Sequence, residues 1–219
     1  EAKDWHEDLA AMATAITNKT RLIFVGNPNN PLGTIASKAA VDELLAKLPQ
    51  DAILVLDEAY YEYVQDPDYP QSIDYVKAGK NVVVLRTFSK GYGIASEEII
   101  GLLGRAREPF NVNSLGQAGA LAALSDTEHL LASQKVNEEG KAYLYREFER
   151  LGLPYIPTEA NFIMVQVTKP CREVFQKLLE RGVIIRTGDI FGLDNFIRVS
   201  IGLPQENQRF IEALTAVLG

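Results

Sequence analysis

Four side chains that could take part in chemistry follow strand-like runs of the sequence. Lys90 closes residues 82–90 (VVVLRTFSK), Asp57 and Tyr60 close residues 52–60 (AILVLDEAY), and Asn30 lies in a turn after residues 21–26 (RLIFVG). A lysine amine that is deprotonated part of the time can form an imine with an aldehyde, so Lys90 is the candidate nucleophile. Because open parallel sheets bind ligands at the carboxyl ends of their strands, we expect the four side chains to converge there.

Each of these residues also has an ordinary structural interpretation. A lysine after a strand is usually a surface residue, Asp57 could cap a turn, and the Asn30-Pro31 pair is a common turn former. Arg198, within residues 196–200 (FIRVS), could form a surface ion pair instead of binding an anion. The hypothesis of a site therefore depends on the combination of these residues.

The pattern of apolar residues predicts the elements that would position this site. Strands are expected over residues 21–26, from 52 and over 82–86, with helices over 9–16 and 37–47 between or before them. This order is typical of crossover connections in a parallel sheet, and the unbroken apolar runs predict strands covered on both faces. Helices are expected over 96–107, 115–124, 127–151, 172–181 and 204–217, and strands over 161–167, 183–186 and 196–202. The expected fold class is α/β, a mostly parallel sheet with helices on both faces plus a smaller C-terminal α/β lobe.

Composition narrows the function classes. The chain has 219 residues, 22 basic and 29 acidic side chains and a formal net charge of −7, without a basic run that could follow a phosphate backbone. Nucleic acid is therefore not an expected partner. Cys171 is the only cysteine, no signal-peptide pattern is present, and no apolar run reaches the ~18 residues of a membrane helix. We expect a cytoplasmic protein without a membrane partner, and no metal site, because His6 and His129 lack ligand spacing.

Considered together and in this order, four motifs resemble the fold-type I pyridoxal-phosphate-dependent aminotransferases, and most closely those that act on histidinol phosphate. The motifs are NPNNPLG (27–33), DEAY (57–60), RTFSK (86–90) and FIRVS (196–200), and the resemblance runs from about residue 4 to residue 218. It implies that residues 1–126 are part of a cofactor-binding large domain, that 127–150 form a linking helix and that 151–219 form a small domain. It also implies a homodimer with a C2 interface.

The resemblance assigns a role to each candidate residue. Lys90 would hold pyridoxal 5'-phosphate and then act as base and acid, while Asp57 would pair with the pyridine nitrogen. Tyr60 and Asn30 would bond the ring oxygen of the cofactor. The hydroxyls of Thr87 and Ser89 would contact the cofactor phosphate, and Arg198, with Arg186 as a second contact, would bind the anionic end of the substrate. The implied reaction transfers an amino group between glutamate or 2-oxoglutarate and a phosphorylated amino alcohol, histidinol phosphate, in histidine biosynthesis.

The sequence departs from the family pattern in two places. The region that would supply a phosphate-binding helix start and a ring-stacking aromatic would precede residue 1. After Lys90, the family continues with a loop that carries an arginine eight residues on, whereas here Gly91-Tyr92-Gly93 follows directly and Glu98 stands at that distance. We therefore expect a gap between Lys90 and Gly91 that is well beyond the ~3.8 Å between Cα atoms across a peptide bond. A normal peptide bond there would instead indicate a true deletion, with weak cofactor binding and little or no catalysis.

Three other functions remain open from the sequence. A related pyridoxal-phosphate decarboxylase or an aromatic aminotransferase could share all of these residues. The third alternative is not an enzyme but a folded lobe that binds only a small anion or a partner chain. Cofactor titration separates the enzymes from the inactive lobe, and a product assay separates the enzymes from one another.

Overall fold

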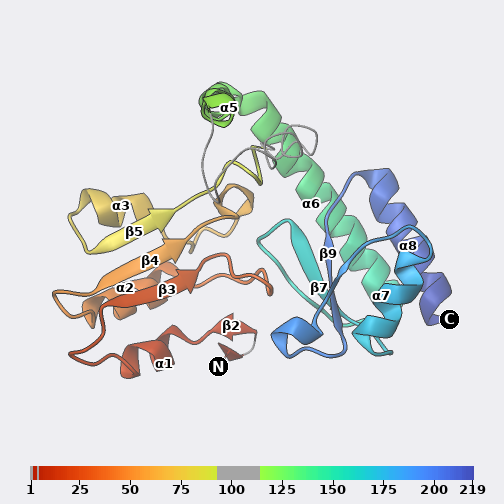
Figure 1. The fold of residues 1–219 in the computed structure, drawn as a ribbon, viewed down its shortest axis with the longest axis horizontal. Helices are drawn as coiled ribbons and strands as arrows, with labels where there is room; N and C mark the ends of the chain where they lie inside the picture. Colours follow the sequence, from red (N-terminus) through yellow and green to blue (C-terminus); the bar gives the residue numbers. More distant parts are fainter. Residues whose placement is uncertain (1, 4, 93–113) are drawn as a thin grey trace.

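The computed structural model describes residues 2–3, 5–92 and 114–219, which form two lobes, each built on its own sheet (Figure 1). The first lobe contains a parallel sheet of β3 (Leu22–Gly26), β4 (Ile53–Asp57) and β5 (Val82–Leu85), in that spatial order. Gly26 lies opposite Asp57, and Asp57 lies opposite Leu85. The carboxyl ends of the three strands therefore meet at one edge of the sheet, as the sequence predicted.

One face of this sheet is covered by helices. These are α1 (Leu9–Thr14), α2 (Lys38–Ala46) and α3 (Ser72–Lys77). The apolar side chains of alternate strand residues pack against them, among them Val25, Leu54 and Leu56, with Val41 and Leu44 of α2 fully buried. Ser37 begins α2 as its N-cap, because its Oγ accepts a hydrogen bond from the Ala40 amide at 3.3 Å.

In the described residues the opposite face of the same sheet is covered only in part, because Val55 of the central strand β4 is buried whereas side chains of the two outer strands are exposed. Phe24 is 65% exposed and Leu22 54%, and Val83 and Leu85 of β5 are also exposed. Unbroken apolar runs predict burial on both faces, but burial requires a second layer, and the described elements supply it only in part.

The second lobe is an antiparallel sheet with helices on one face. Its strands are β6 (Tyr155–Ile156), β7 (Phe162–Gln166), β9 (Phe196–Ser200) and β8 (Arg186–Thr187), in the order β6-β7-β9-β8. The helices α6 (Thr127–Arg150), α7 (Cys171–Leu179) and α8 (Pro204–Leu218) form the core with this sheet. Leu144 and Phe148 of α6, Ile197 of β9 and Leu214 of α8 are fully buried in that core.

The other face of the second sheet packs against the loops that leave the first sheet. Leu32, which follows β3, clusters with Met164 and Phe196, and Tyr60, which follows β4, clusters with Phe162. These contacts place the carboxyl ends of the parallel strands beside the second lobe (Figure 1).

The remaining elements are short or lie at the margins. They are β1 (Ala2–Lys3), β2 (His6–Glu7), the 3-10 helices η1 (Tyr61–Tyr63) and η2 (Asp189–Phe191), and α5 (Ser114–Ser125). The sequence pattern did not predict β1, β2, β6 or α3. Among the described residues, no helix combines the length and the apolar character needed to cross a membrane.

Most predicted elements are confirmed within a few residues, and two need comment. The strand expected over 183–186 starts only at Arg186, because the Val183 amide bonds to Leu178 O and closes the end of α7 instead of joining a ladder. The helix expected over 96–107 lies outside the described residues.

Candidate active site

Three of the predicted site residues lie at the carboxyl ends of β4 and β5. Asp57 is the last residue of β4, its side chain is exposed, and its Oδ1 accepts a hydrogen bond from the Ala59 amide at 3.1 Å. Lys90 follows β5, and its Nζ lies 5.5 Å from the centre of the Tyr60 ring. The amine, the phenol and the carboxylate therefore lie at the same edge of the sheet.

Tyr60 connects this edge to the second lobe. Its ring is buried and meets the ring of Phe162 edge-on, with centroids 5.2 Å apart and an interplanar angle of 84°. Burial raises the pKa of the Tyr60 phenol, and the nearby charge of Asp57 adds to this effect while Arg198 opposes it. The phenol therefore stays protonated near neutral pH and can donate a hydrogen bond.

Arg198 brings a positive charge to the site from β9. Its guanidinium lies 4.8 Å from the centre of the Phe162 ring, and its Nη1 donates to Oδ1 of Asn30 at 2.5 Å. Asn30 follows β3, so this hydrogen bond joins the two lobes. The structure thus brings Asn30 to Arg198, a contact that the sequence did not suggest.

Arg186 lies directly opposite Arg198 in the β8–β9 pair. Burial lowers the pKa of Arg198, and the charge of Arg186 lowers it further, while Tyr60 opposes both effects. Neither guanidinium forms an ion pair with a described carboxylate. Two adjacent arginines without a counter-charge can bind an anionic group.

Thr87 and Ser89 form a small hydroxyl cluster just before Lys90. Their Oγ atoms lie 2.7 Å apart, and the Ser89 amide donates to Oγ1 of Thr87 at 3.2 Å. Hydroxyls and amides in such a turn can supply donors to a phosphate, although they carry no charge. Both residues lie where the sequence placed them, beside the candidate lysine.

Three residues of this region were missed by sequence reasoning. Phe162 contacts both Tyr60 and Arg198, but the sequence shows it only as one apolar residue of a strand. Glu58 and Arg86 form an ion pair at the strand ends. Both stand inside the motifs DEAY and RTFSK, and a search for opposite charges beside those motifs could have found them.

The gap expected between Lys90 and Gly91 is not found, because the described chain continues from Lys90 into Gly91 and Tyr92. Gly91 and Tyr92 form a turn, and the Tyr92 ring lies 5.3 Å from that of Phe88. Glu98, which stands in place of the expected arginine, lies outside the described residues, and so does the 108–113 segment (EPFNVN), which the family resemblance places near the junction of the expected homodimer.

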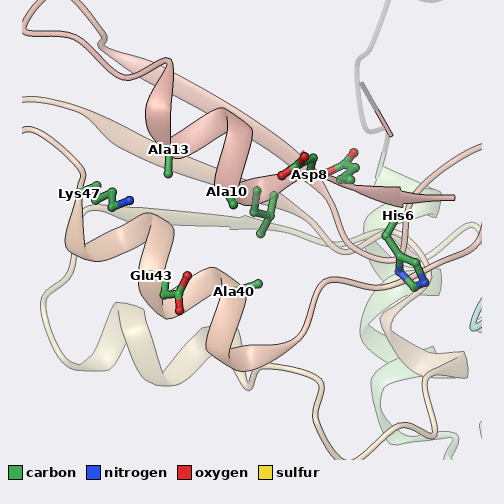
Figure 2. Close-up of a pocket in the computed structure, with 9 residues that line it drawn as sticks. His6, Asp8, Ala10, Ala13, Ala40, Glu43 and Lys47 are labelled. Atoms are coloured by element: carbon green, nitrogen blue, oxygen red, sulfur yellow. The ribbon is translucent and has the colours of Figure 1, made fainter. Parts of the chain in front are cut away.

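A cavity of about 370 Å³ between α1 and α2 is separate from this site (Figure 2). Among the side chains that line it are His6, Asp8, Glu43 and Lys47. No candidate residue lines it, so it has no part in the chemistry of the strand ends.

Comparison with known proteins identifies the family. The family model "Aminotransferase class I and II" matches residues 1–214. A histidinol-phosphate aminotransferase of Moorella thermoacetica is 55% identical over 226 residues, which cover 99% of this chain and 58% of that protein.

Two solved structures share the fold. A putative histidinol-phosphate aminotransferase of Erwinia carotovora atroseptica matches with a TM-score of 0.85 and 30% identity over 98% of this chain and 66% of its own. A histidinol-phosphate aminotransferase of Sinorhizobium meliloti in complex with pyridoxal-5'-phosphate matches with a TM-score of 0.83 and 28% identity over 99% of this chain and 62% of its own. The chain spans less than two thirds of each of these proteins. It belongs to the aminotransferase class I and II family.

Proposed function

We propose that this chain carries part of a pyridoxal-phosphate-dependent aminotransferase. The observation that carries the proposal is the convergence of Lys90, Asp57 and Tyr60 at adjacent strand ends, next to the uncompensated Arg198 and Arg186. The family match and the bound cofactor of the Sinorhizobium relative support it.

The residues present fit pyridoxal phosphate. The exposed carboxylate of Asp57 suits a protonated ring nitrogen, the protonated phenol of Tyr60 suits a ring oxygen, and the turn at Thr87 and Ser89 suits a phosphate. Asn30 is a second donor for the ring oxygen, although its Oδ1 accepts from Arg198. When bound, pyridoxal phosphate supplies a reactive aldehyde and a ring that withdraws electrons from the reacting carbon.

The side chains of this chain then do the remaining work. Lys90 Nζ acts first as the nucleophile that holds the cofactor and later as the base and acid that moves a proton. The Asp57 carboxylate keeps a positive charge on the ring nitrogen, and the Tyr60 phenol orients the ring through its hydroxyl. The paired guanidiniums of Arg198 and Arg186 orient the anionic end of the substrate relative to Lys90.

The proposed substrates are histidinol phosphate, a phosphorylated amino alcohol, and the pair glutamate and 2-oxoglutarate. A phosphate is bound well by two guanidiniums, because each offers a planar fork of donors. The name of the Moorella relative, at 55% identity, points to the same substrate and to histidine biosynthesis.

Cofactor capture tests the first part of this proposal. The protein is incubated with pyridoxal phosphate, reduced with borohydride and digested, and the modified lysine is found by mass spectrometry. We expect the label on Lys90 and its loss in Lys90→Ala, while Lys80→Ala, at the amino end of β5, keeps it. A label that remains after Lys90→Ala would refute the assigned site.

A product assay tests the substrate. Full-length protein is supplied with 2-oxoglutarate and, in turn, histidinol phosphate, phenylalanine or threonine phosphate. We expect glutamate to form fastest with histidinol phosphate. Faster reaction with phenylalanine would favour an aromatic aminotransferase, and release of carbon dioxide from threonine phosphate would favour a decarboxylase.

We also propose the larger-scale arrangement expected from the resemblance. The parent protein is cytoplasmic and a homodimer, residues 1–126 belong to the large domain, 127–150 form the link and 151–219 form the small domain. Sedimentation of the full-length protein should show a dimer at micromolar concentration, and limited proteolysis should release a core that keeps α6, because Leu144 and Phe148 of that helix are buried in the second lobe. An active monomer would contradict the dimer.

A further inference from the structure

An ion pair between the buried Glu58 and the partly exposed Arg86 joins the two strand ends that carry the candidate residues. Glu58 is fully buried, and its Oε2 accepts hydrogen bonds from Nε and Nη2 of Arg86 at 2.9 and 2.8 Å. The Arg86 guanidinium also lies 3.5 Å from the centre of the Tyr61 ring. Glu58 follows β4 and Arg86 follows β5, so the pair links the carboxyl ends of two neighbouring strands.

Burial and charge around this pair shift the pKa values of Arg86 and of its neighbours. Burial alone would lower the pKa of Arg86, but the hydrogen bond and charge of Glu58 outweigh it and raise that pKa. A second carboxylate, Glu62, faces the same region, and burial raises its pKa. Burial and the charge of Glu58 likewise raise the pKa of Tyr69. The Glu58 carboxylate is fully buried, so it depends on the Arg86 guanidinium for a charge partner at the strand ends.

The pair is attached to the site on both sides. Glu58 stands between Asp57 and Tyr60, and its amide donates to Leu85 O at 2.8 Å, so the DEAY turn is tied to the end of β5. Arg86 begins the connection that ends in Lys90. Holding Glu58 and Arg86 together therefore restrains the distance between the turn that carries the carboxylate and phenol and the turn that carries the amine.

We propose that Glu58 and Arg86 are positioning residues that hold Lys90 in register with Asp57 and Tyr60. Neither touches the reacting atoms, and their effect is exerted through the two turns. The inference deepens the proposed function and rests on it for its chemical meaning, but the restraint itself can be measured without cofactor.

Hydrogen exchange of the cofactor-free chain tests the restraint. In the double variant Glu58→Gln/Arg86→Met both charges are removed, so no unpaired buried charge is left to unfold the chain. We expect amide exchange in residues 57–61 and 86–90 to accelerate roughly tenfold or more, with residues 162–166 of β7 unchanged. Arg86→Lys keeps the positive charge but loses the fork of donors, and it should show the same pattern more weakly.

The matched control is another pair with the same geometry. Arg150 donates through Nε and Nη2 to Oε2 of Glu147 at 2.9 and 2.7 Å, within α6 and away from the strand ends. Glu147→Gln should leave exchange at 57–61 and 86–90 at the level of the unmodified chain. If the double variant and Arg86→Lys also stay at that level, the positioning role is wrong. If both variants unfold, the pair is structural and the inference is likewise overturned.

Cofactor capture at Lys90 provides the second readout. We expect the double variant, folded as judged by circular dichroism, to form the borohydride-stable adduct roughly ten- to a hundredfold more slowly, because small misplacements of reacting groups carry such penalties. Capture at the unmodified rate would overturn the inference and leave the proposed function intact. If the unmodified chain forms no adduct at Lys90, the proposed function fails, and the exchange experiment still decides whether the pair restrains the two turns.

Discussion

At the scale of single residues, a substitution of Asp57 tests whether its carboxylate has a chemical role or a structural one. Asp57→Ala removes an exposed carboxylate whose described contact is the Ala59 amide, so the free energy of unfolding should fall by about 1 kcal/mol or less. Transamination by full-length protein should fall about 10²- to 10³-fold, because the partner of a charged ring nitrogen is lost. Initial rates and urea denaturation measure the two effects.

Asp51 is the control for this prediction, since it precedes the same strand at its other end. Asp51→Ala loses only an exposed contact of 3.8 Å with Arg21 and should change neither rate nor stability. Loss of folding and activity in equal measure for Asp57→Ala would instead make this carboxylate a turn cap.

A second residue-scale prediction concerns pH and Asp189. Hydrogen bonds from Thr187 and Arg172 lower the pKa of Asp189 from 3.8 to about 2. A carboxyl whose pKa is lowered in the folded state stabilises the fold above its unfolded pKa, and this contribution is lost as pH falls through the folded pKa. Asp189→Asn should therefore lower the melting temperature at pH 7, and the difference should shrink between pH 3.8 and about pH 2.

Asp194, exposed in the same loop, provides the comparison. Asp194→Asn should melt like the unmodified chain at pH 7. If the difference in melting temperature for Asp189→Asn persists unchanged at pH 2, the hydrogen bonds of Asp189 do not depend on its negative charge.

At the scale of elements, the exposed apolar side chains on one face of the β3-β4-β5 sheet predict self-association of the isolated chain. Exposed apolar faces of this kind drive association, and parallel sheets are rarely left uncovered. Phe24, at 65% exposure, is the largest contributor. We predict that Phe24→Thr weakens self-association of the isolated chain roughly tenfold, the effect of removing about 1.4 kcal/mol of apolar burial.

Sedimentation velocity over a range of concentrations measures this effect. Ile184, which is 78% exposed in the second lobe and outside this sheet, supplies the control. Ile184→Thr should leave self-association unchanged. Equal weakening by both substitutions would show that association depends on general hydrophobicity and not on the sheet face.

At the scale of the whole molecule, Gly33 lies at a close contact between the two lobes. Its φ is +78°, and a Cβ at this position would lie 1.9 Å from Oγ1 of Thr158. Its carbonyl accepts a hydrogen bond from the Glu159 amide at 2.8 Å. Gly33→Ala should therefore lower the free energy of unfolding by about 3 kcal/mol or more, since backbone strain adds to a clash across the junction.

Gly152 is the control in which a substitution meets the same backbone strain without a steric clash. Its φ is +66°, and nothing lies within 4 Å of the position of a Cβ. Gly152→Ala should cost only about 1–2 kcal/mol, the penalty of a left-handed conformation. Equal costs for the two substitutions in urea denaturation would show that the lobes separate easily at Gly33.

The sequence by itself determined the local features of this protein. Apolar runs predicted β3, β4 and β5 and the helices α2, α6 and α8, because strand and helix periodicities are set by neighbouring residues. The motifs that hold Asp57, Tyr60 and Lys90 followed those runs, so their placement at strand ends was predictable.

Only the tertiary structure decided what meets across the molecule. The contact of Arg198 with Asn30 joins residues 168 positions apart, and Phe162 contacts Tyr60 only because β7 packs beside the end of β4. The pairing of Glu58 with Arg86 depends on the register of β4 and β5. Local sequence specifies which face of an element is apolar, but which partner covers that face, or whether any does, is decided by the packing of distant segments.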